Sequence, residues 1–376
     1  MLTRLYCDNY KCLVNFEFRA QPLQLLMGRN GAGKSTVFEV LELISAFIRG
    51  ELQIRDEPIE EHLVGRTRTR WQQVEQQRFE LNVRGEDGTY LYELVVDEWG
   101  QPTAYPRVLK ESVTLEGKPL FLFENGTVHL HNNQFQEKVQ FPFNPRRSGL
   151  SIVEARKDNT KLSWLKGWLG RMLCLQIDPT VMGPRAEKEA VRPAFNLSNF
   201  ADWYRYLRLS QGKATDDLRR SLQEVISGFE SLDFADAGLN TRVLHAVVRA
   251  GEGNGKALRY AFHELSDGQR VLIGLYTVLH CALTDQATLC IDEPDNFISL
   301  AEIQPWLSRL CDTAQETGSQ VLIASHHPEL LNQLATRSGV VLERVDDRQT
   351  LARPFAPPND TTLTPAEIVA RGWERV

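Results

Sequence analysis

The sequence contains few cysteines and no apolar run long enough to cross a membrane. Its six cysteines are scattered and form no CxxC pair, so disulfides and structural zinc are disfavoured and a reduced, cytoplasmic protein is expected. The stretches LQLLMG and VLIGLYTVLHCAL are too short or too interrupted for a transmembrane helix. The opening MLTRLYCDNYKCL lacks the apolar core of a signal peptide. These absences argue against a secreted disulfide-rich protein and against a membrane-embedded one.

Net positive charge and heptad repeats are also missing. The 43 Lys and Arg residues are outnumbered by 49 Asp and Glu, a net charge of −6, so no global basic field attracts nucleic acid. No heptad run and no internal repeat is visible. The remaining composition is that of an ordinary globular protein, with 376 residues, 42% hydrophobic and 24% charged. This length allows one large domain or two lobes.

Hydrophobic periodicity predicts an α/β protein with an antiparallel insert. Alternating residues lead up to Gly28, and TVFEVLELISAFIRG after it has helical spacing. From 78 to 143 the pattern is strand-like, with turns at EDG, EGK and ENG, which predicts an antiparallel meander. Residues 151–240 are mostly helical in pattern, and TRVLHAVVRA and KALRYAFHEL then predict a hairpin. Further on, we expect helices at 267–283, 300–316 and 328–335, strands at 288–291, 319–324 and 339–345, and a short terminal helix.

The segment GRNGAGKST fits the pattern GxxxxGK[ST] between an expected strand and an expected helix. Glycines at this spacing let successive backbone N–H groups turn inward around phosphate oxygens, and the helix N-terminus adds positive potential. Lys34 is expected to reach the β- and γ-phosphates of ATP, and Ser35 to coordinate Mg²⁺. The candidate nucleotide-binding residues are Gly28, Arg29, Asn30, Gly31, Ala32, Gly33, Lys34, Ser35 and Thr36.

The segment TLCIDEP places two carboxylates at the end of an apolar strand, where ligands bind in open α/β folds. Together with a phosphate loop, this pattern favours Asp292 as a Mg²⁺ ligand, mostly through water. It favours Glu293 as the general base that polarises the attacking water. Without a phosphate loop, a strand followed by Asp-Glu is common and indicates only the end of a strand.

The segment HELSDGQR lies shortly before the acidic strand. Ser266 is a good N-cap for a helix that begins at Asp267, and its hydroxyl, the Gly268 N–H and the helix dipole make a second anion site. Because the phosphate loop already surrounds its own phosphates, this second site suggests a γ-phosphate held by another copy of the chain. Taken alone, however, the segment favours an ordinary capped helix. The candidate residues are Ser266, Asp267, Gly268 and Gln269.

The segment VLIASHHPELL is an apolar strand that ends in His326 and His327. A histidine at such a strand end can contact the γ-phosphate and orient the attacking water. Considered alone, either histidine is better interpreted as a hydrogen-bonded polar side chain with no catalytic role.

The ordered set GxNGxGKST, LSDGQ, an apolar strand ending in DEP, and SHHP resembles the ABC-type ATPases. The opening LYCDNYKCL is similar to that of the RecF, SMC and OLD-like branch. The segments NLSNFADWYRYL and ELSDGQRVLIGLYTVL resemble stand-alone AAA-type proteins of that branch, several of which are ATPase subunits of anti-phage systems, including the Septu and retron-associated ATPases. The resemblance gives the role of switch histidine to His326. It also implies that Ser266 and Gly268 of one subunit close on ATP bound at Lys34 of another.

The resemblance implies a P-loop NTPase fold of the ABC-ATPase head type, with a mixed core sheet, an antiparallel β subdomain and a helical lobe that bears the signature. We expect a single head over residues 1–376. Within it, an ATP-binding lobe with the phosphate loop and the meander spans 1–150, and a mainly helical lobe spans 151–265. The signature helix, the Walker B strand and the switch histidine span 266–345, and a C-terminal tail spans 346–376.

Some features depart from the family pattern. Asp267 replaces the first glycine of the commoner LSGGQ. The glutamine of the Q-loop is not assigned, because Gln134, Gln136 or a residue near 150–157 all fit. The coiled-coil arms of the SMC group are absent, and no Toprim-like nuclease domain follows His326, so this chain alone is not expected to cut nucleic acid.

Two functional classes follow from these observations. The first is an ATPase that uses ATP and Mg²⁺, forms an ATP-dependent homodimer or higher oligomer, and switches a separate effector such as a nuclease in nucleic-acid surveillance or anti-phage defence. Basic clusters at 65–71, at 145–147 and at Arg219 and Arg220 leave contacts with DNA or RNA open. The second is the nucleotide-binding subunit of a membrane transporter, which the long insert before the signature and the NYKCL opening disfavour. No membrane contact is expected.

Overall fold

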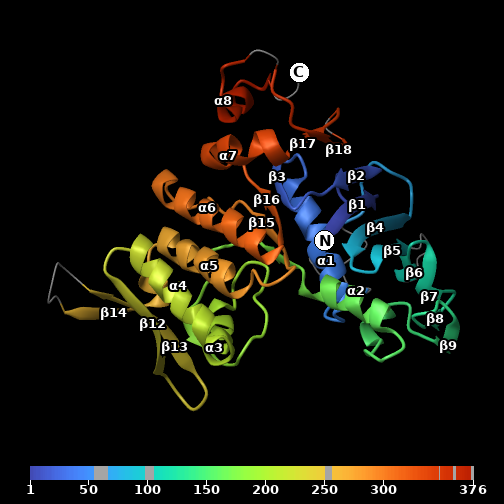
Figure 1. The fold of residues 1–376 in the computed structure, drawn as a ribbon, viewed down its shortest axis with the longest axis horizontal. Helices are drawn as coiled ribbons and strands as arrows, with labels where there is room; N and C mark the ends of the chain where they lie inside the picture. Colours follow the sequence, from blue (N-terminus) through green and yellow to red (C-terminus); the bar gives the residue numbers. More distant parts are fainter. Residues whose placement is uncertain (55–66, 98–105, 250–255, 347, 359–360, 374–376) are drawn as a thin grey trace. The chain divides into compact units, whose positions relative to one another are not determined.

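The computed structural model describes residues 1–54, 67–97, 106–249, 256–346, 348–358 and 361–373. The chain divides into two compact units (Figure 1). Unit 1 consists of Met1–Leu173 and Leu334–Val376, and unit 2 consists of Cys174–Gln333. Within the described residues, every helix is too short or too polar to span a bilayer.

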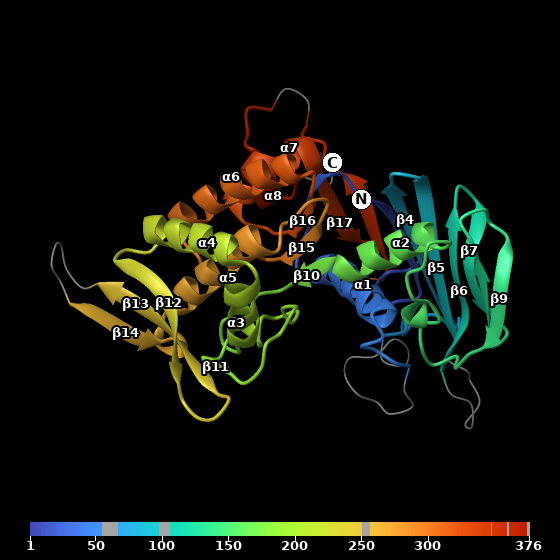
Figure 2. The same cartoon turned by 60° about the horizontal axis from the view of Figure 1, so that its bottom comes forward.

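An antiparallel sheet of eight strands dominates unit 1, in the order β2-β1-β4-β5-β6-β7-β8-β9. The strands are β1 (Leu2–Asp8), β2 (Phe16–Arg19), β4 (Gln76–Gly85), β5 (Gly88–Asp97), β6 (Arg107–Leu115), β7 (Lys118–Glu124), β8 (Thr127–His131) and β9 (Glu137–Pro142). From β4 to β9 each strand pairs with its neighbour in sequence (Figure 2). The predicted antiparallel meander is therefore confirmed.

The two faces of this sheet differ in polarity, as the period-2 pattern requires. On β4, the side chains of Phe79, Leu81 and Val83 are fully buried. The opposite face carries a ladder of ion pairs across neighbouring strands. Its pairs are Arg4 with Glu17 and Glu80, Arg78 with Glu80 and Glu93, and Lys110 with Glu93.

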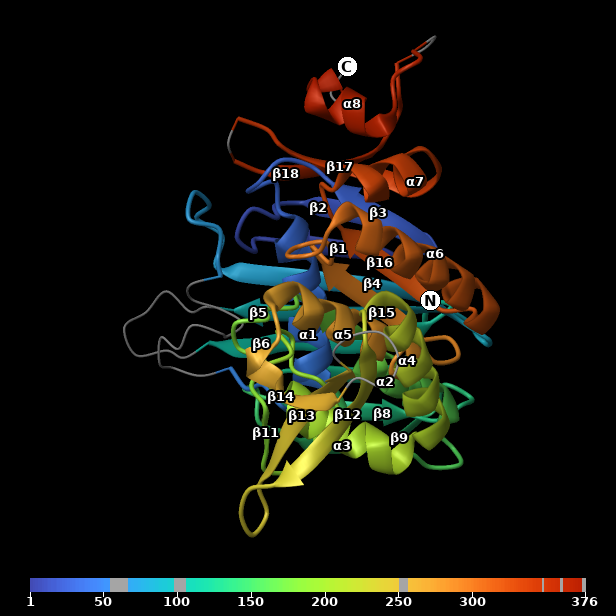
Figure 3. The ribbon, with the colours of Figure 1, turned by 90° about the vertical axis from the view of Figure 1, so that its left-hand side faces the viewer.

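Three further strands and the helices complete unit 1. They are β3 (Leu23–Met27), β17 (Gly339–Arg344), β18 (Thr350–Pro354), α1 (Lys34–Ile48), η1 (Leu150–Ile152), α2 (Thr160–Arg171) and α8 (Pro365–Ala370). β3 and β17 are parallel, and β17 pairs with β18 in the antiparallel sense (Figure 3). α1 packs against α2, where the Ser45 hydroxyl donates to the Leu169 carbonyl over 2.8 Å.

Unit 2 contains a parallel strand pair, a group of helices and a small antiparallel sheet. The elements are β11 (Arg185–Ala186), α3 (Phe200–Ser210), α4 (Gly212–Val225), β12 (Phe229–Asp236), β13 (Arg242–Arg249), β14 (Ala257–Ala261), η2 (Phe262–Glu264), α5 (Asp267–Cys281), β15 (Thr288–Asp292), α6 (Leu300–Thr317) and β16 (Gln320–Ala324). Two further elements, β10 (Leu173–Leu175) and α7 (Pro328–Ser338), contain residues of both units. β15 and β16 are parallel. α4 and α6 both pack against α5 (Figure 1). The helices and strands predicted after residue 266 are confirmed.

One segment differs from the prediction. The pattern of ATDDLRRSLQEVISGFESL predicts a helix throughout, but α4 ends at Val225 and β12 begins at Phe229. Phe229 and Leu232 are both buried and stand three residues apart, which suits a helix face as well as an irregular strand. Pairing with β13 decides in favour of the strand. Residues 251–255, the predicted hairpin tip, lie outside the described residues.

Candidate functional site

The phosphate loop of unit 1 joins β3 to α1. Gly33 is the N-cap of α1 with a φ of 102°, and no side chain caps this helix. Gly28 has a φ of 148°, and a Cβ there would collide with the Leu342 carbonyl. At Gly31 a Cβ would meet nothing within 4 Å, so the loop is open at this point. This arrangement suits the binding of a phosphate group.

The side chains of the loop fit a magnesium-bound triphosphate. Lys34 is only 6% exposed, and its Nζ donates to the Gly28 carbonyl over 2.9 Å. An ammonium group held on the loop itself is a compact charge complement for phosphate oxygens. Ser35 is exposed in the first turn of α1 and offers a hydroxyl oxygen of the kind that Mg²⁺ prefers. Arg29 and Asn30 are exposed at the tip of the loop.

A residue that the sequence did not single out fixes the loop from outside. The Thr350 hydroxyl donates to the Ala32 carbonyl over 2.9 Å, and its N–H donates to the Cys12 carbonyl over 2.9 Å. Thr350 begins β18, which was not predicted because TLARP is short and ends in proline. Thr350 therefore joins the phosphate loop to the N-terminal turn that contains Cys12.

In unit 2, β15 ends at Asp292, which is 1% exposed. Gln176 directly follows β10 and donates from Nε2 to Asp292 Oδ2 over 3.2 Å. Gln134 and Gln136 instead lie in the turn between β8 and β9, where their N–H groups donate to Asn132 Oδ1. A glutamine beside the acidic strand is thus present, but the sequence analysis missed it. The apolar MLCL before Gln176 was the available signal, hidden in a region with a helical pattern.

Glu293 has an unusual backbone and a histidine partner. Its φ of 47° is a left-handed conformation that costs a non-glycine residue roughly 1–3 kcal/mol, and its N–H donates to the Ala324 carbonyl over 2.8 Å. His326 Nδ1 lies 2.8 Å from Glu293 Oε2. His327 has another partner, because its Nδ1 accepts from the Glu329 N–H at the start of α7. The structure therefore places His326, and not His327, against Glu293.

The signature residues of unit 2 form a complete capping box at the start of α5. The Ser266 hydroxyl accepts from the Gln269 N–H over 3.3 Å, and Gln269 Oε1 accepts from the Ser266 N–H over 3.1 Å. Asp267 pairs with Arg270 one turn later. A Cβ on Gly268 would lie 2.7 Å from the Phe297 carbonyl. Each signature residue thus has a local structural role, whether or not it also meets a nucleotide.

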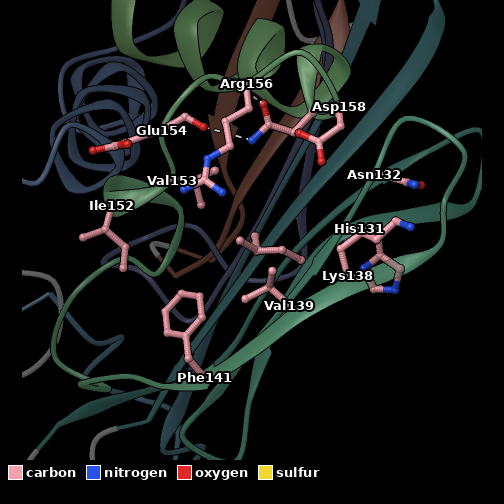
Figure 4. Close-up of a pocket in the computed structure, with 12 residues that line it drawn as sticks. His131, Asn132, Lys138, Val139, Phe141, Ile152, Val153, Glu154, Arg156 and Asp158 are labelled. Carbon is pink, nitrogen blue, oxygen red and sulfur yellow. Dashed lines mark hydrogen bonds between the residues drawn. The ribbon is translucent and has the colours of Figure 1, made fainter.

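Two cavities in the described part of the chain lie away from these motifs and contain none of the predicted nucleotide or metal residues, although Arg219 of a predicted basic cluster lines the second. One, of about 310 Å³, lies between β8, β9 and the segment at 152–159, with Val139 and Phe141 facing Val153 and Arg156 (Figure 4). The other, of about 340 Å³, lies between α3, α4 and β12. Across the described part of the chain, no group of three or more His, Cys, Asp or Glu residues is arranged to hold a metal ion.

Two protein-family models match the chain. Residues 181–332 match "AAA domain, putative AbiEii toxin, Type IV TA system", and residues 13–87 match "ABC transporter". No curated protein sequence matches the chain. The first match therefore covers the signature and acidic strand, and the second covers the phosphate loop.

A solved structure of an SMC head is similar in fold to this chain. An SMC head bound to the C-winged helix domain of ScpA is 12% identical, with 94% of this chain and 98% of that chain covered and a TM-score of 0.56. An SMC head domain from Thermotoga maritima is 11% identical, with 95% and 99% covered and a TM-score of 0.47. The first of these two structures shows that the chain has the fold of an ABC-type ATPase head. Together with the family matches, this supports a P-loop ABC-type ATPase.

Proposed function

We propose that the chain binds ATP with Mg²⁺ and hydrolyses it. The observation that carries this proposal is the pairing of His326 with Glu293, a carboxylate held in strained backbone at the end of an apolar strand. Backbone strain of this kind is typical of functional sites. The phosphate loop with Lys34 supplies the groups that would bind the phosphates.

Each residue has a distinct role in this proposal. Lys34 and the loop N–H groups would hold the phosphates. Ser35 and Asp292 would each serve as a Mg²⁺ ligand, and the ion would neutralise charge that develops on the phosphates. Glu293 accepts the proton of the attacking water, and His326 orients that water and the carboxylate. Gln176 holds Asp292 in position through its amide.

The two adjacent histidines provide a matched test. Glu293→Gln is expected to retain ATP binding and to lose hydrolysis by about 100-fold or more, because the general base is removed. His326→Asn is expected to slow hydrolysis strongly, whereas His327→Asn keeps a side chain that can cap α7 and leaves the rate unchanged. A phosphate-release assay measures all three. Equal rates in the two histidine variants would contradict the role given to His326.

We further infer that ATP draws two copies of the chain together and that this switches a separate effector. Ser266 and Gly268 of one copy then contact the γ-phosphate held by Lys34 of the other. The similar SMC head is bound to a domain of another protein, which supports a separate partner here. We place this switch in the cytoplasm and in anti-phage defence, with a nuclease as effector and with DNA or RNA contacts at the basic clusters. The match to a model described by a toxin and a Type IV TA system is in keeping with a defence role.

A transporter subunit is the second candidate. The match of residues 13–87 to the "ABC transporter" model is the observation that favours it. The large antiparallel insert from β4 to β9 disfavours this function, because transporter subunits seldom carry so long an insert between the phosphate loop and the signature. Co-purification separates the two functions, since a nuclease or nucleic acid supports the first and a membrane protein supports the second.

A further inference from the structure

One edge of the large sheet of unit 1 is open. In the described part of the chain, β9 pairs with β8 and with no other strand. Its residues are exposed apart from Phe141, which is half-buried. The Phe143 N–H donates to the Gly126 carbonyl, on the side of β8, over 2.8 Å. Because hydrogen bonding alternates along an antiparallel pair, the N–H and the carbonyl of Gln140 face away from β8 and are presented along the edge.

The pocket in Figure 4 lies beside this edge. Its volume is about 310 Å³, and apolar side chains of β8, β9, η1 and the segment after η1 line it. Val139 is 45% exposed and Ile152 is 48% exposed, so both present apolar surface to a ligand. A pocket of this volume is small for a drug-sized molecule but large enough for a side chain of a bound peptide.

An arginine gives this pocket a positive charge. Arg156 is exposed, and no carboxylate of the described residues forms an ion pair with its guanidinium. Its backbone is fixed, because the Arg156 N–H donates to Asn159 Oδ1 over 2.7 Å and the Asn159 amide donates to the Glu154 carbonyl over 2.9 Å. The guanidinium extends into the pocket beside Val153, whereas the Glu154 carboxylate points away from it (Figure 4). A guanidinium placed in this way favours a carboxylate of the ligand.

We propose that β9 and this pocket bind an extended segment of a partner protein, in which an apolar residue lies next to an Asp or Glu. The segment adds a strand to the sheet through the backbone groups of Gln140. Its apolar side chain enters the pocket, and its carboxylate meets Arg156. Lys138 and Asp158 also line the pocket and offset each other in charge, so Arg156 sets the preference for an anion. This inference goes beyond the proposed function and does not depend on ATP binding.

Selection from a phage-displayed library of random peptides, on the full chain and without nucleotide, tests the inference. We expect the enriched peptides to share an apolar residue next to Asp or Glu, and fluorescence anisotropy then measures the affinity for the labelled consensus peptide. Gln140→Pro removes an N–H that faces the edge and no hydrogen bond to β8. The affinity should therefore fall at least about tenfold. Gln140→Ala keeps this N–H and should bind with wild-type affinity.

The charge of the pocket is tested separately. Arg156→Gln removes a charge-assisted hydrogen bond and should weaken binding at least about tenfold. Arg84→Gln is the matched control, because Arg84 is an exposed arginine of β4 and four strands separate β4 from β9. It should leave the affinity unchanged. Since Arg156 is exposed, its variant keeps the test decisive even if Gln140→Pro does not fold.

Two results would overturn the assignment. One is that the library yields no enriched peptide, or that the consensus peptide binds Arg156→Gln or folded Gln140→Pro with wild-type affinity. The other is a dimer that forms without ATP and is lost in Gln140→Pro, as seen by native mass spectrometry, because the edge then binds a second copy of the chain. Neither result bears on ATP hydrolysis, which depends on other residues.

Discussion

The phosphate loop and the signature each lead into a helix of 15 residues, but the two helices begin in different ways. α5 begins with a complete capping box, in which Ser266 and Gln269 bond each other's N–H groups. α1 begins at Gly33 in a left-handed conformation with no side-chain cap. The start of α1 therefore suits an anion in the place of a side-chain cap, whereas two N–H groups at the start of α5 are already bonded by the capping box.

This difference shows where geometry carries a functional assignment and where it does not. The uncapped helix and the buried Lys34 point to a phosphate ligand by themselves. The signature looks like any well-capped helix, and even Gly268 has a packing reason, since Phe297 approaches it closely. Its assignment depends on the order of motifs along the chain. The two regions accordingly need different tests.

The largest effect is expected at the phosphate loop. Lys34→Ala removes the ammonium group, and charge-assisted hydrogen bonds to phosphate are each worth roughly 1.5–3 kcal/mol. We expect ATP affinity to fall by about 100-fold or more, as measured by calorimetry. Lys118→Ala removes an exposed lysine of β7 that packs over Phe135 and should leave ATP affinity unchanged. If Lys34→Ala binds ATP with wild-type affinity, the loop does not bind the phosphates in the way proposed.

A smaller effect is expected at a buried polar cluster of unit 1 that contains none of the motif residues. Glu111 is fully buried and accepts hydrogen bonds from the Tyr92 hydroxyl at 3.0 Å, the Ser148 hydroxyl at 2.6 Å and the Leu150 N–H. Burial raises the pKa of the Glu111 carboxyl above its ordinary value. We therefore expect a change at Glu111 to alter the free energy of unfolding and not the affinity for ATP.

The sign of its pH dependence follows from linkage. With a raised pKa in the folded state, the Glu111 carboxyl favours folding below its unfolded-state pKa, and this contribution is lost as pH rises through the folded-state pKa. The free energy of unfolding of the wild type should therefore decline with rising pH relative to that of Glu111→Gln, which cannot ionise. Urea unfolding of both proteins at several pH values measures the difference. A constant difference across the pH range would show that Glu111 keeps an ordinary pKa.

The elements with strong periodicity and clear boundaries could be predicted from the sequence. The meander between 78 and 143 has an alternating pattern with glycine turns, and α1, α5 and α6 have helical patterns that end near the observed residues. The strands β12 and β18 could not be predicted. The buried residues of β12 are spaced three apart, and β18 is short and ends in proline, so the local pattern is ambiguous in both. Only pairing with β13 and β17 defines them as strands.

The candidate site shows the same limit. The motif residues could be named because phosphate binding needs glycines and lysine at a fixed spacing. Gln176 and Thr350 could not be named from the sequence. Gln176 contacts Asp292 and Thr350 contacts Ala32, and both partners are distant in sequence. The choice between His326 and His327 rested on family resemblance. The contacts of the two imidazoles now give a physical reason for it.

The central claim is that the signature meets ATP bound by a second copy of the chain. Glu293→Gln removes the base but keeps the shape of the site, so it should accumulate the closed form when ATP is present. Ser266→Arg, added to it, places a bulky cation at the contact and should abolish that form. Thr364→Arg is the matched control, because Thr364 and Glu367 form the same capping box on α8 without an assigned role.

Native mass spectrometry of Glu293→Gln with and without ATP and Mg²⁺ tests this claim most directly. We expect monomers without ATP and a symmetric dimer carrying two nucleotides with ATP. The dimer should persist in the double variant with Thr364→Arg and disappear in the double variant with Ser266→Arg. If Glu293→Gln keeps the same mass in both conditions while binding ATP, the signature is only a capped helix, and the switching role proposed for the chain is wrong.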